Sequence, residues 1–181
     1  MKPWLAWTMG VAMLVVAWGV VQVTPAEDDA QAPFIVAAQV GEPAAARAFE
    51  ATVTDVRLAD RAVAGGWAAD GTWVVVDLEV ASRVEEQGVL LSHAVLVVDD
   101  LTFRASERPE SLFRSDLSVG IPRAGSIAFE IPAELVDRPA VLRLATDDDT
   151  RLDSVMEIAV DLGALERDGE AELADTGWAE R

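Results

Sequence analysis

The sequence predicts an all-β protein, an antiparallel β-sandwich of seven to eight strands preceded by one N-terminal transmembrane helix. Residues 72–80 carry branched aliphatic side chains at every second position, the period of a strand with one face in a core. These side chains are Val74, Val76, Leu78 and Val80. Similar short stretches follow, separated by turn residues and without a long helical pattern between them, which favours a sandwich over βαβ units.

The composition limits the classes of function. The chain has 181 residues and a net charge of -18, so its surface repels nucleic acid and anionic lipid headgroups. We therefore expect no nucleic-acid partner. Cysteine is absent, which excludes disulfides, thiolate metal sites, a cysteine nucleophile and a lipid-modified cysteine. The length allows one ordinary domain with appendages.

The N-terminal stretch predicts a membrane anchor. Residues 4–21 carry no charge, and with Gln22 and Val23 they make a helix long enough, at ~1.5 Å per residue, to cross ~30 Å of hydrocarbon. Residues 4–23 would then contact membrane lipid. Lys2 precedes the stretch and acidic residues follow it, which predicts a cytoplasmic N-terminus and an extracytoplasmic C-terminal domain. The alternative is a cleaved signal peptide, which places the remainder outside the cytoplasm as well.

The rest of the chain divides into three predicted parts. Residues 24–33 read as an acidic linker, 34–162 as the sandwich and 163–181 as an acidic flexible tail. The expected strands are 34–40, at an edge, then 49–59, 72–80, 94–98, 101–105, 126–131, 140–146 and 154–162. We expect a bulge near Thr54, a glycine-rich loop over 65–71, an irregular stretch over 106–122 and a helical turn within 133–138.

Two stretches resemble a known family. Residues 71–82, Gly-Thr-Trp-Val-Val-Val-Asp-Leu-Glu-Val-Ala-Ser, and residues 122–132, Pro-Arg-Ala-Gly-Ser-Ile-Ala-Phe-Glu-Ile-Pro, resemble the bacterial telokin-like, immunoglobulin-like extracytoplasmic domains of unknown function. Such domains occur on lipoproteins, secreted proteins and single-pass membrane proteins. The resemblance covers roughly residues 49–162 and implies an immunoglobulin-like sandwich outside the membrane, with no catalytic residues to transfer. The chain departs from the family in lacking a lipobox cysteine and in having Ala81-Ser82 after the first stretch.

The chemistry-bearing residues argue against an enzyme. Lys2 is the only lysine, which excludes a phosphate-binding loop ending in lysine, and no Gly-x-Ser-x-Gly elbow is present. His93 is the only histidine, and we interpret it as an ordinary strand or loop residue. A carboxylate pair of the glycosidase type stays a distant third possibility. We predict no cofactor.

One acidic turn is a candidate ion site. Asp147, Asp148, Asp149 and Asp153 lie close together in the sequence, and their oxygens are ligands that calcium prefers. The EF-hand pattern fails here, because the sixth position from Asp147 is Leu152 and the twelfth is Ile158. A solvated hairpin turn is the favoured interpretation.

The candidate binding residues are Trp67, Trp73, Leu112 and Phe113. The tryptophans bracket the predicted glycine-rich loop, where an exposed indole can act as a binding hot spot, although burial of both is the favoured alternative. The predicted function is a non-enzymatic, membrane-anchored extracytoplasmic binding or assembly module for another envelope protein, such as a transporter or secretion complex. The alternative is a secreted soluble ligand- or calcium-binding protein released by signal cleavage.

Overall fold

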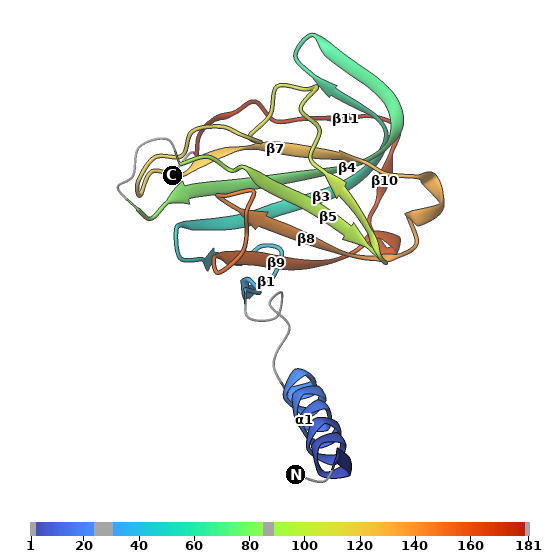
Figure 1. The fold of residues 1–181 in the computed structure, drawn as a ribbon. Helices are drawn as coiled ribbons and strands as arrows, with labels where there is room; N and C mark the ends of the chain where they lie inside the picture. The colour runs from blue at the N-terminus through green and yellow to red at the C-terminus, as the bar shows by residue number, and fades with distance from the viewer. Residues whose placement is uncertain (1–2, 24–30, 85–88, 180–181) are drawn as a thin grey trace. The chain divides into compact units, whose positions relative to one another are not determined.

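The structure is a computed structural model that describes residues 3–23, 31–84 and 89–179. The chain forms two compact units, Met1–Ala32 and Pro33–Arg181 (Figure 1). The predicted linker falls largely on residues 24–30, which lie outside the described residues. The second unit extends to the end of the chain, beyond the predicted domain boundary at residue 162.

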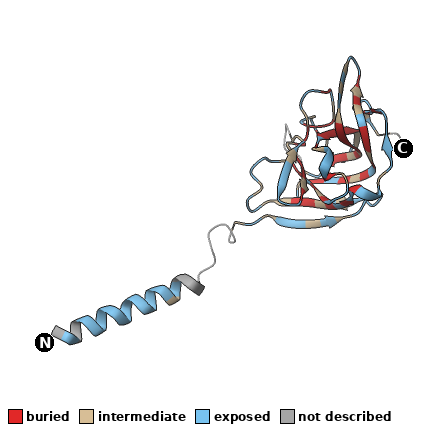
Figure 2. Ribbon diagram, turned by 90° about the vertical axis from the view of Figure 1, so that its right-hand side faces the viewer, coloured by how far each residue is buried: buried red, intermediate tan, exposed pale blue. Residues whose placement is uncertain are grey.

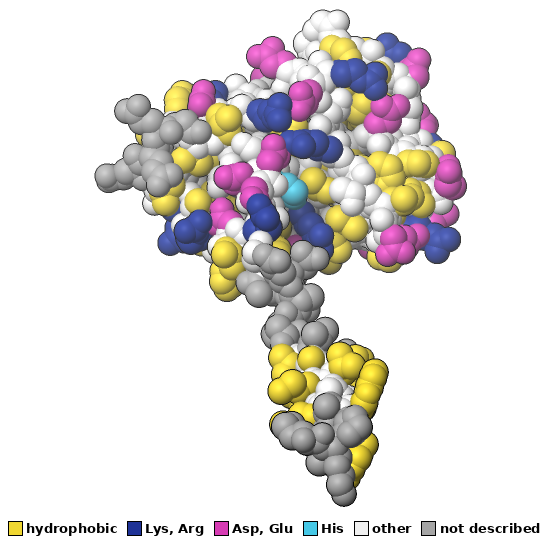
Figure 3. Space-filling view, in the orientation of Figure 1, with side chains coloured by type: hydrophobic (Ala, Val, Ile, Leu, Met, Phe, Trp, Pro, Cys, Tyr) yellow, Lys and Arg dark blue, Asp and Glu magenta, His cyan; other side chains and the backbone are white. Residues whose placement is uncertain are grey.

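The first unit contains one helix, α1 (Pro3–Val23). Its described side chains are almost all exposed and mostly apolar, as the pale blue helix of Figure 2 and the yellow helix of Figure 3 show. In the described parts of the chain, no helix has both the length and the apolar character needed to cross a membrane. The predicted transmembrane span over residues 4–23 is therefore not supported.

The second unit is a β-sandwich, as predicted. The smaller sheet has the order β1-β9-β8-β5-β6. Its strands are β1 (Phe34–Ala38), β5 (His93–Val98), β6 (Leu101–Arg104), β8 (Pro139–Ala145) and β9 (Ser154–Asp161). The predicted edge strand is confirmed, because among the described strands β1 pairs with β9 alone, and it does so in parallel. The predicted hairpin is also confirmed: β5 and β6 pair on either side of Asp99-Asp100.

The larger sheet has the order β10-β3-β4-β7-β12, with β2 and β11 also paired to β3. Its strands are β2 (Ala44–Ala45), β3 (Phe49–Ala64), β4 (Trp67–Ser82), β7 (Arg123–Glu130), β10 (Arg167–Asp168), β11 (Ala171–Glu172) and β12 (Gly177–Trp178). A register shift between Val53 and Asp55 confirms the predicted bulge. The predicted loop over 65–71 is wrong, because β4 already begins at Trp67 and only Gly65-Gly66 turns the chain.

The main core lies between the two sheets (Figure 2). The alternating aliphatic residues of β4 supply one side of it, as their spacing predicts, and Leu96, Leu142 and Ile158 of the smaller sheet pack in the same cluster. The predicted helical turn is confirmed as a short 3₁₀ turn, Ala133–Leu135, and a second one follows at Leu162–Ala164. Most of the correctly predicted strands are therefore ones in which every second side chain is buried.

The predicted flexible tail is wrong for the described residues up to 179. We call residues 165–179 the C-terminal strap; they can be followed in red through β10 and β11 to the C-terminus in Figure 1. β10 and β11 pair in parallel with the free edge of β3, and β12 pairs antiparallel with the opposite edge, β7. The sandwich is consequently not purely antiparallel, and its described residues form twelve strands rather than seven or eight.

The strap covers a second, smaller core on the outer face of the larger sheet. Ala171 and Leu173 of the strap are buried there against Trp73, Val75 and Ala128. Both faces of β4 are therefore buried along this part of the strand. Glycine at position 125 favours the close approach of the strap, because a Cβ there would lie 3.3 Å from the Cα of Thr176, a tight contact.

Candidate binding surface

The structure brings Trp67 and Trp73 together but buries most of their surface. Trp73 is fully buried in the second core, and Trp67 is half-buried against it. Their rings meet edge to face, with centroids 5.5 Å apart and planes at 88°. The guanidinium of Arg108 lies 5.9 Å from the Trp73 ring centroid, on a side chain that also pairs with Glu130 at 2.7 Å. The favoured alternative, burial, is thus confirmed for Trp73, which has no exposed surface to offer a partner in this structure.

Leu112 and Phe113, the other predicted contact residues, are also buried, so the structure does not place them on an exposed surface. The backbone N–H of Leu112 donates to the carbonyl of Ser126 at 2.9 Å, which holds the irregular stretch onto β7. The side chain of Leu112 enters the main core. The guanidinium groups of Arg104 and Arg114 each lie 5.6 Å from the centroid of the Phe113 ring. An irregular backbone is therefore compatible here with burial of the Leu112 and Phe113 side chains.

The structure pairs the carboxylates of the acidic turn with arginines. Asp148 pairs with Arg104 at 2.5 Å, Asp149 with Arg151 at 2.7 Å and Asp153 with Arg47 at 2.8 Å. The oxygen of Asp147 accepts the backbone N–H of Asp149. No group of three or more potential ligands that could hold a metal ion occurs among the described residues. The carboxylates of Asp148, Asp149 and Asp153 are directed to separate arginines, and calcium binding at this turn stays an untested prediction.

An ion pair in this turn also stabilises the charged form of a carboxylate. The hydrogen bond from the Arg151 side chain lowers the pKa of Asp149 from 3.8 to about 2. Interleaved acidic and basic side chains are visible on the face of the sandwich shown in Figure 3. The arginines thus neutralise much of the acidic surface locally, although the chain as a whole stays strongly negative.

His93 begins β5 and is half-buried. Burial lowers the pKa of its imidazole from 6.5; the nearby Asp148 acts in the opposite direction, and Arg104 and Arg143 add to the lowering. The folded protein therefore binds a proton at His93 less readily than the unfolded chain does.

This lowered pKa predicts a pH dependence of stability. As the pH falls below 6.5, the unfolded chain gains a proton at His93 before the folded protein does, so the free energy of unfolding decreases. Urea unfolding between pH 7 and 5 measures the effect, and His93→Gln serves as the control with a flatter profile. Equal slopes for the wild type and the variant would contradict the assignment.

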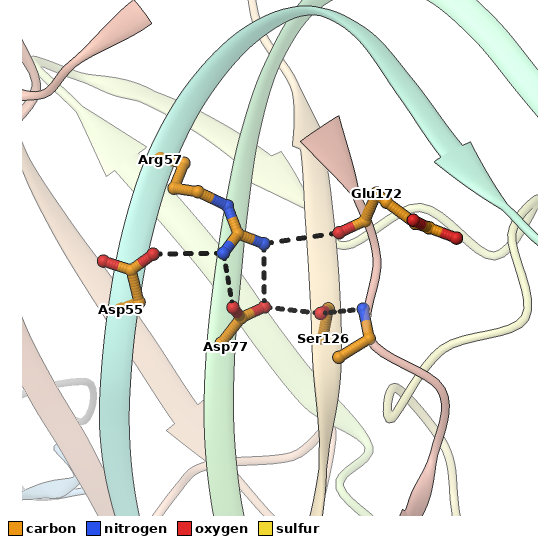
Figure 4. Close-up of polar contacts among 6 residues, drawn as sticks. Asp55, Arg57, Asp77, Ser126 and Glu172 are labelled. Atoms are coloured by element: carbon orange, nitrogen blue, oxygen red, sulfur yellow. Dashed lines mark hydrogen bonds and ion pairs between the residues drawn. The ribbon is translucent and has the colours of Figure 1, made fainter. Parts of the chain in front are cut away.

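A polar network on the outer face fastens the strap to the sheet (Figure 4). Arg57 of β3 binds Asp77 of β4 through two hydrogen bonds, of 2.7 and 3.2 Å, and it donates to Asp55 at 3.1 Å. The buried hydroxyl of Ser126 on β7 donates to Asp77 at 2.5 Å and accepts the strap N–H of Ala174 at 2.7 Å. Three adjacent strands and the strap are thereby joined through one carboxylate.

We call this network of Arg57, Asp77 and Ser126 the clamp, because it binds the strap to the sheet. Arg57 also donates to the strap carbonyl of Glu172 at 3.4 Å. A polar hollow of about 300 Å³ beside it is lined by Arg57, Asp77 and strap residues 172–175. The described partners of the Ser126 hydroxyl are the Asp77 carboxylate and the backbone amide of Ala174, so the hydroxyl joins β4 to the strap.

A separate pocket of about 230 Å³ lies on the outer face beyond the clamp. The strand register places Glu50 opposite Ala81, and Thr52 opposite Glu79, on the side of the sheet away from the main core. The lining residues come from three segments: Pro43, Ala44, Ala45; Glu50, Ala51, Thr52; and Glu79, Val80, Ala81, with Pro122 closing the pocket. We call this the acidic pocket.

Exposed apolar side chains stand close to the acidic pocket. Pro122 lines it, and the carbonyl of Pro122 accepts the N–H of Ala179 at 3.0 Å, which brings the end of the strap alongside. Trp178 is 61% exposed, with the Arg123 guanidinium 5.4 Å from its ring centroid, and Ile121 is 51% exposed. None of these residues was among the predicted binding residues.

Comparison with known proteins identifies the fold. No protein-family model and no curated protein matches the chain. Among solved structures, a "putative lipoprotein" from Staphylococcus aureus subsp. aureus NCTC 8325 is 12% identical, with a TM-score of 0.50, over 74% of this chain and 97% of that one. An uncharacterized β-sandwich protein from Clostridium difficile 630 is 11% identical, with a TM-score of 0.50, over 76% and 99%. At such identities the likeness shows a shared β-sandwich fold; the telokin-like, immunoglobulin-like resemblance is not confirmed.

Proposed function

We propose that the protein is a non-enzymatic binding or assembly module of the cell envelope, with its β-sandwich outside the cytoplasm and its N-terminal helix as a tether. The observation that carries the proposal is the division of the chain into an exposed apolar helix and a separately folded sandwich. The partner is another envelope protein, of the kind found in transporters or secretion complexes.

The helix supports a tethering role because it is apolar on every side. Four consecutive residues, 13–16, are each at least 62% exposed, and four consecutive positions span a full turn. Such a helix is stable only in apolar surroundings, which lipid or a partner protein can supply. The proposal requires that the helix be held at the envelope, by either means.

Two further observations support an envelope module. The Staphylococcus aureus neighbour carries the description of a putative lipoprotein. The two stretches that resemble immunoglobulin-like extracytoplasmic domains form β4 and β7, which pair directly with each other over Trp73–Val80 and Arg123–Glu130. We accordingly assign the sandwich to the immunoglobulin-like kind as part of the proposal.

The tether is tested by placing a charge in the helix. Leu14→Asp removes a side chain worth about 1.5–3 kcal/mol on burial, so we expect at least a tenfold drop in the ratio of membrane-bound to soluble protein. Cell fractionation followed by immunoblotting measures the ratio, and mass spectrometry of the N-terminus identifies the mature chain.

Leu101→Asp is the matched control, because Leu101 is an exposed leucine of the sandwich itself. It should leave the distribution unchanged. A wild-type protein that is soluble, trimmed after the helix and crosslinked to no envelope protein would overturn the proposal and favour a released binding protein.

A further inference from the structure

We infer that the acidic pocket binds a lysine or arginine side chain presented by the partner protein; this inference rests on the proposed binding function and names the chemistry that the partner must offer. The pocket lies on the part of the outer face of the larger sheet that the clamp and the second core leave open. Along β4, the buried Trp73 and the clamped Asp77 come first, and the pocket occupies the positions from Glu79 to Ala81.

The first argument is the ion-pair pattern of the three central strands. β3, β4 and β7 contain seven acidic residues: Glu50, Asp55, Asp60, Asp70, Asp77, Glu79 and Glu130. Five of them pair with arginines within 3.1 Å. Glu50 and Glu79, which both line the pocket, form no ion pair with any described residue. The unpaired carboxylates of these strands are thus gathered at one hollow.

The second argument is the shape and lining of the pocket. Seven of its ten lining residues are proline, alanine or valine, and Ala81 is only 1% exposed. Lysine and arginine pack an aliphatic stem on apolar surface while the charged head stays in a polar site. A volume of about 230 Å³ is below the ~300–1,000 Å³ of most small-molecule sites and suits one inserted side chain.

The third argument is the surface beside the pocket. The exposed Trp178 and Ile121 adjoin Pro122 and offer apolar contact area to the backbone that carries the inserted side chain. Tryptophan is enriched among residues that dominate binding energy. The net charge of -18 attracts a basic segment over a distance and raises its association rate at low salt. Charge, shape and neighbouring surface therefore favour the same occupant.

A peptide titration tests the pocket directly. The full-length protein in zwitterionic detergent is titrated with acetyl-Ala-Arg-Ala-amide, and with acetyl-Ala-Gln-Ala-amide as the neutral probe, while backbone amide NMR signals are followed. We expect saturable shifts at residues 50–52 and 79–81 with the arginine peptide only. Binding should weaken about tenfold in the double variant Glu50→Gln, Glu79→Gln, because two ion pairs are lost.

Two variants separate charge from space. Glu134→Gln is the charge control, because Glu134 follows β7 at the end remote from Pro122, and it should bind the peptide as the wild type does. Thr52→Phe keeps both carboxylates but fills the hollow, and it should abolish binding. Equal binding of the two peptides, or undiminished binding by the double variant, would overturn the inference.

Crosslinking in cells distinguishes this inference from the proposed function. If both hold, a recurrent envelope partner is crosslinked to the wild type and to Glu134→Gln, and its yield falls in the double variant. If only the proposed function holds, the double variant gives the same yield as the wild type. If no variant yields an envelope partner, the proposed function fails, and saturable arginine binding in the titration would then identify the pocket as a site for a free cationic ligand.

Discussion

Replacing Trp73 with alanine is expected to lower the free energy of unfolding by about 3–5 kcal/mol, the range for a large aromatic side chain removed from a core. Trp73 is a residue of β4 and is fully buried, in the same cluster as Ala171 and Leu173 of the strap. The substitution also removes the edge-to-face contact with Trp67, whose ring centroid lies 5.5 Å away. Urea unfolding followed by far-ultraviolet circular dichroism measures the loss.

Two controls give this result its meaning. Trp178→Ala, at an exposed tryptophan, should change stability by less than about 0.5 kcal/mol. Trp73→Phe should recover most of the stability, because the Nε1 atom of Trp73 has no hydrogen-bond partner among the described residues and its removal breaks no hydrogen bond. If Trp73→Ala unfolded like the wild type but lost its partner, Trp73 would be a contact residue after all.

Replacing Asp77 with alanine is expected to cost about 2 kcal/mol and to release the strap. The carboxylate receives two hydrogen bonds from Arg57 and one from Ser126, so its loss leaves a part-buried guanidinium and a buried hydroxyl without their acceptor. Removing one partner of such a pair costs more than the pair contributes, although partial exposure of both side chains moderates the effect. Hydrogen exchange should accelerate most at residues 171–178.

Asp55→Ala is the matched control for this substitution. Asp55 also accepts from Arg57, at 3.1 Å, but its side chain is 54% exposed, so its loss should cost less than about 0.5 kcal/mol. A double-mutant cycle with Ser126→Ala should give a coupling of about 1 kcal/mol between Asp77 and Ser126. Additive effects together with unchanged exchange in the strap would show that the network does not hold the strap.

The sequence pattern predicted the structure best where the signal lies within a short stretch of the chain, such as the alternation of buried and exposed side chains. The alternation in β4, the bulge near Thr54 and the hairpin at Asp99-Asp100 each depend on neighbouring residues, and each is confirmed. The strap was missed because each of its strands pairs over two residues and its composition is acidic. The available signal was local: Ala171 and Leu173 have the spacing of one buried strand face.

The candidate site was harder to predict because it depends on contacts between distant segments. Leu112 and Phe113 looked exposed because the stretch around them lacks a periodic pattern, yet a backbone hydrogen bond to Ser126 turns that stretch into the core. The acidic pocket needs β2, β3, β4 and Pro122 at once. Glu50 and Glu79 are ordinary outward-facing strand residues in the sequence, and only the pairing register shows that they share a hollow.

The strap also determines when this fold can be finished. Arg167 pairs with Asp60 across 107 positions of sequence, so the part of the β3 edge from Leu58 to Val63 stays unpaired until a segment made much later arrives. Contacts of such separation slow folding, and an open strand edge is a template for joining other chains. Until the strap has been made, the nascent sandwich is therefore exposed to aggregation at both edges of its larger sheet. The arrival of a few strap residues ends that hazard on both sides together.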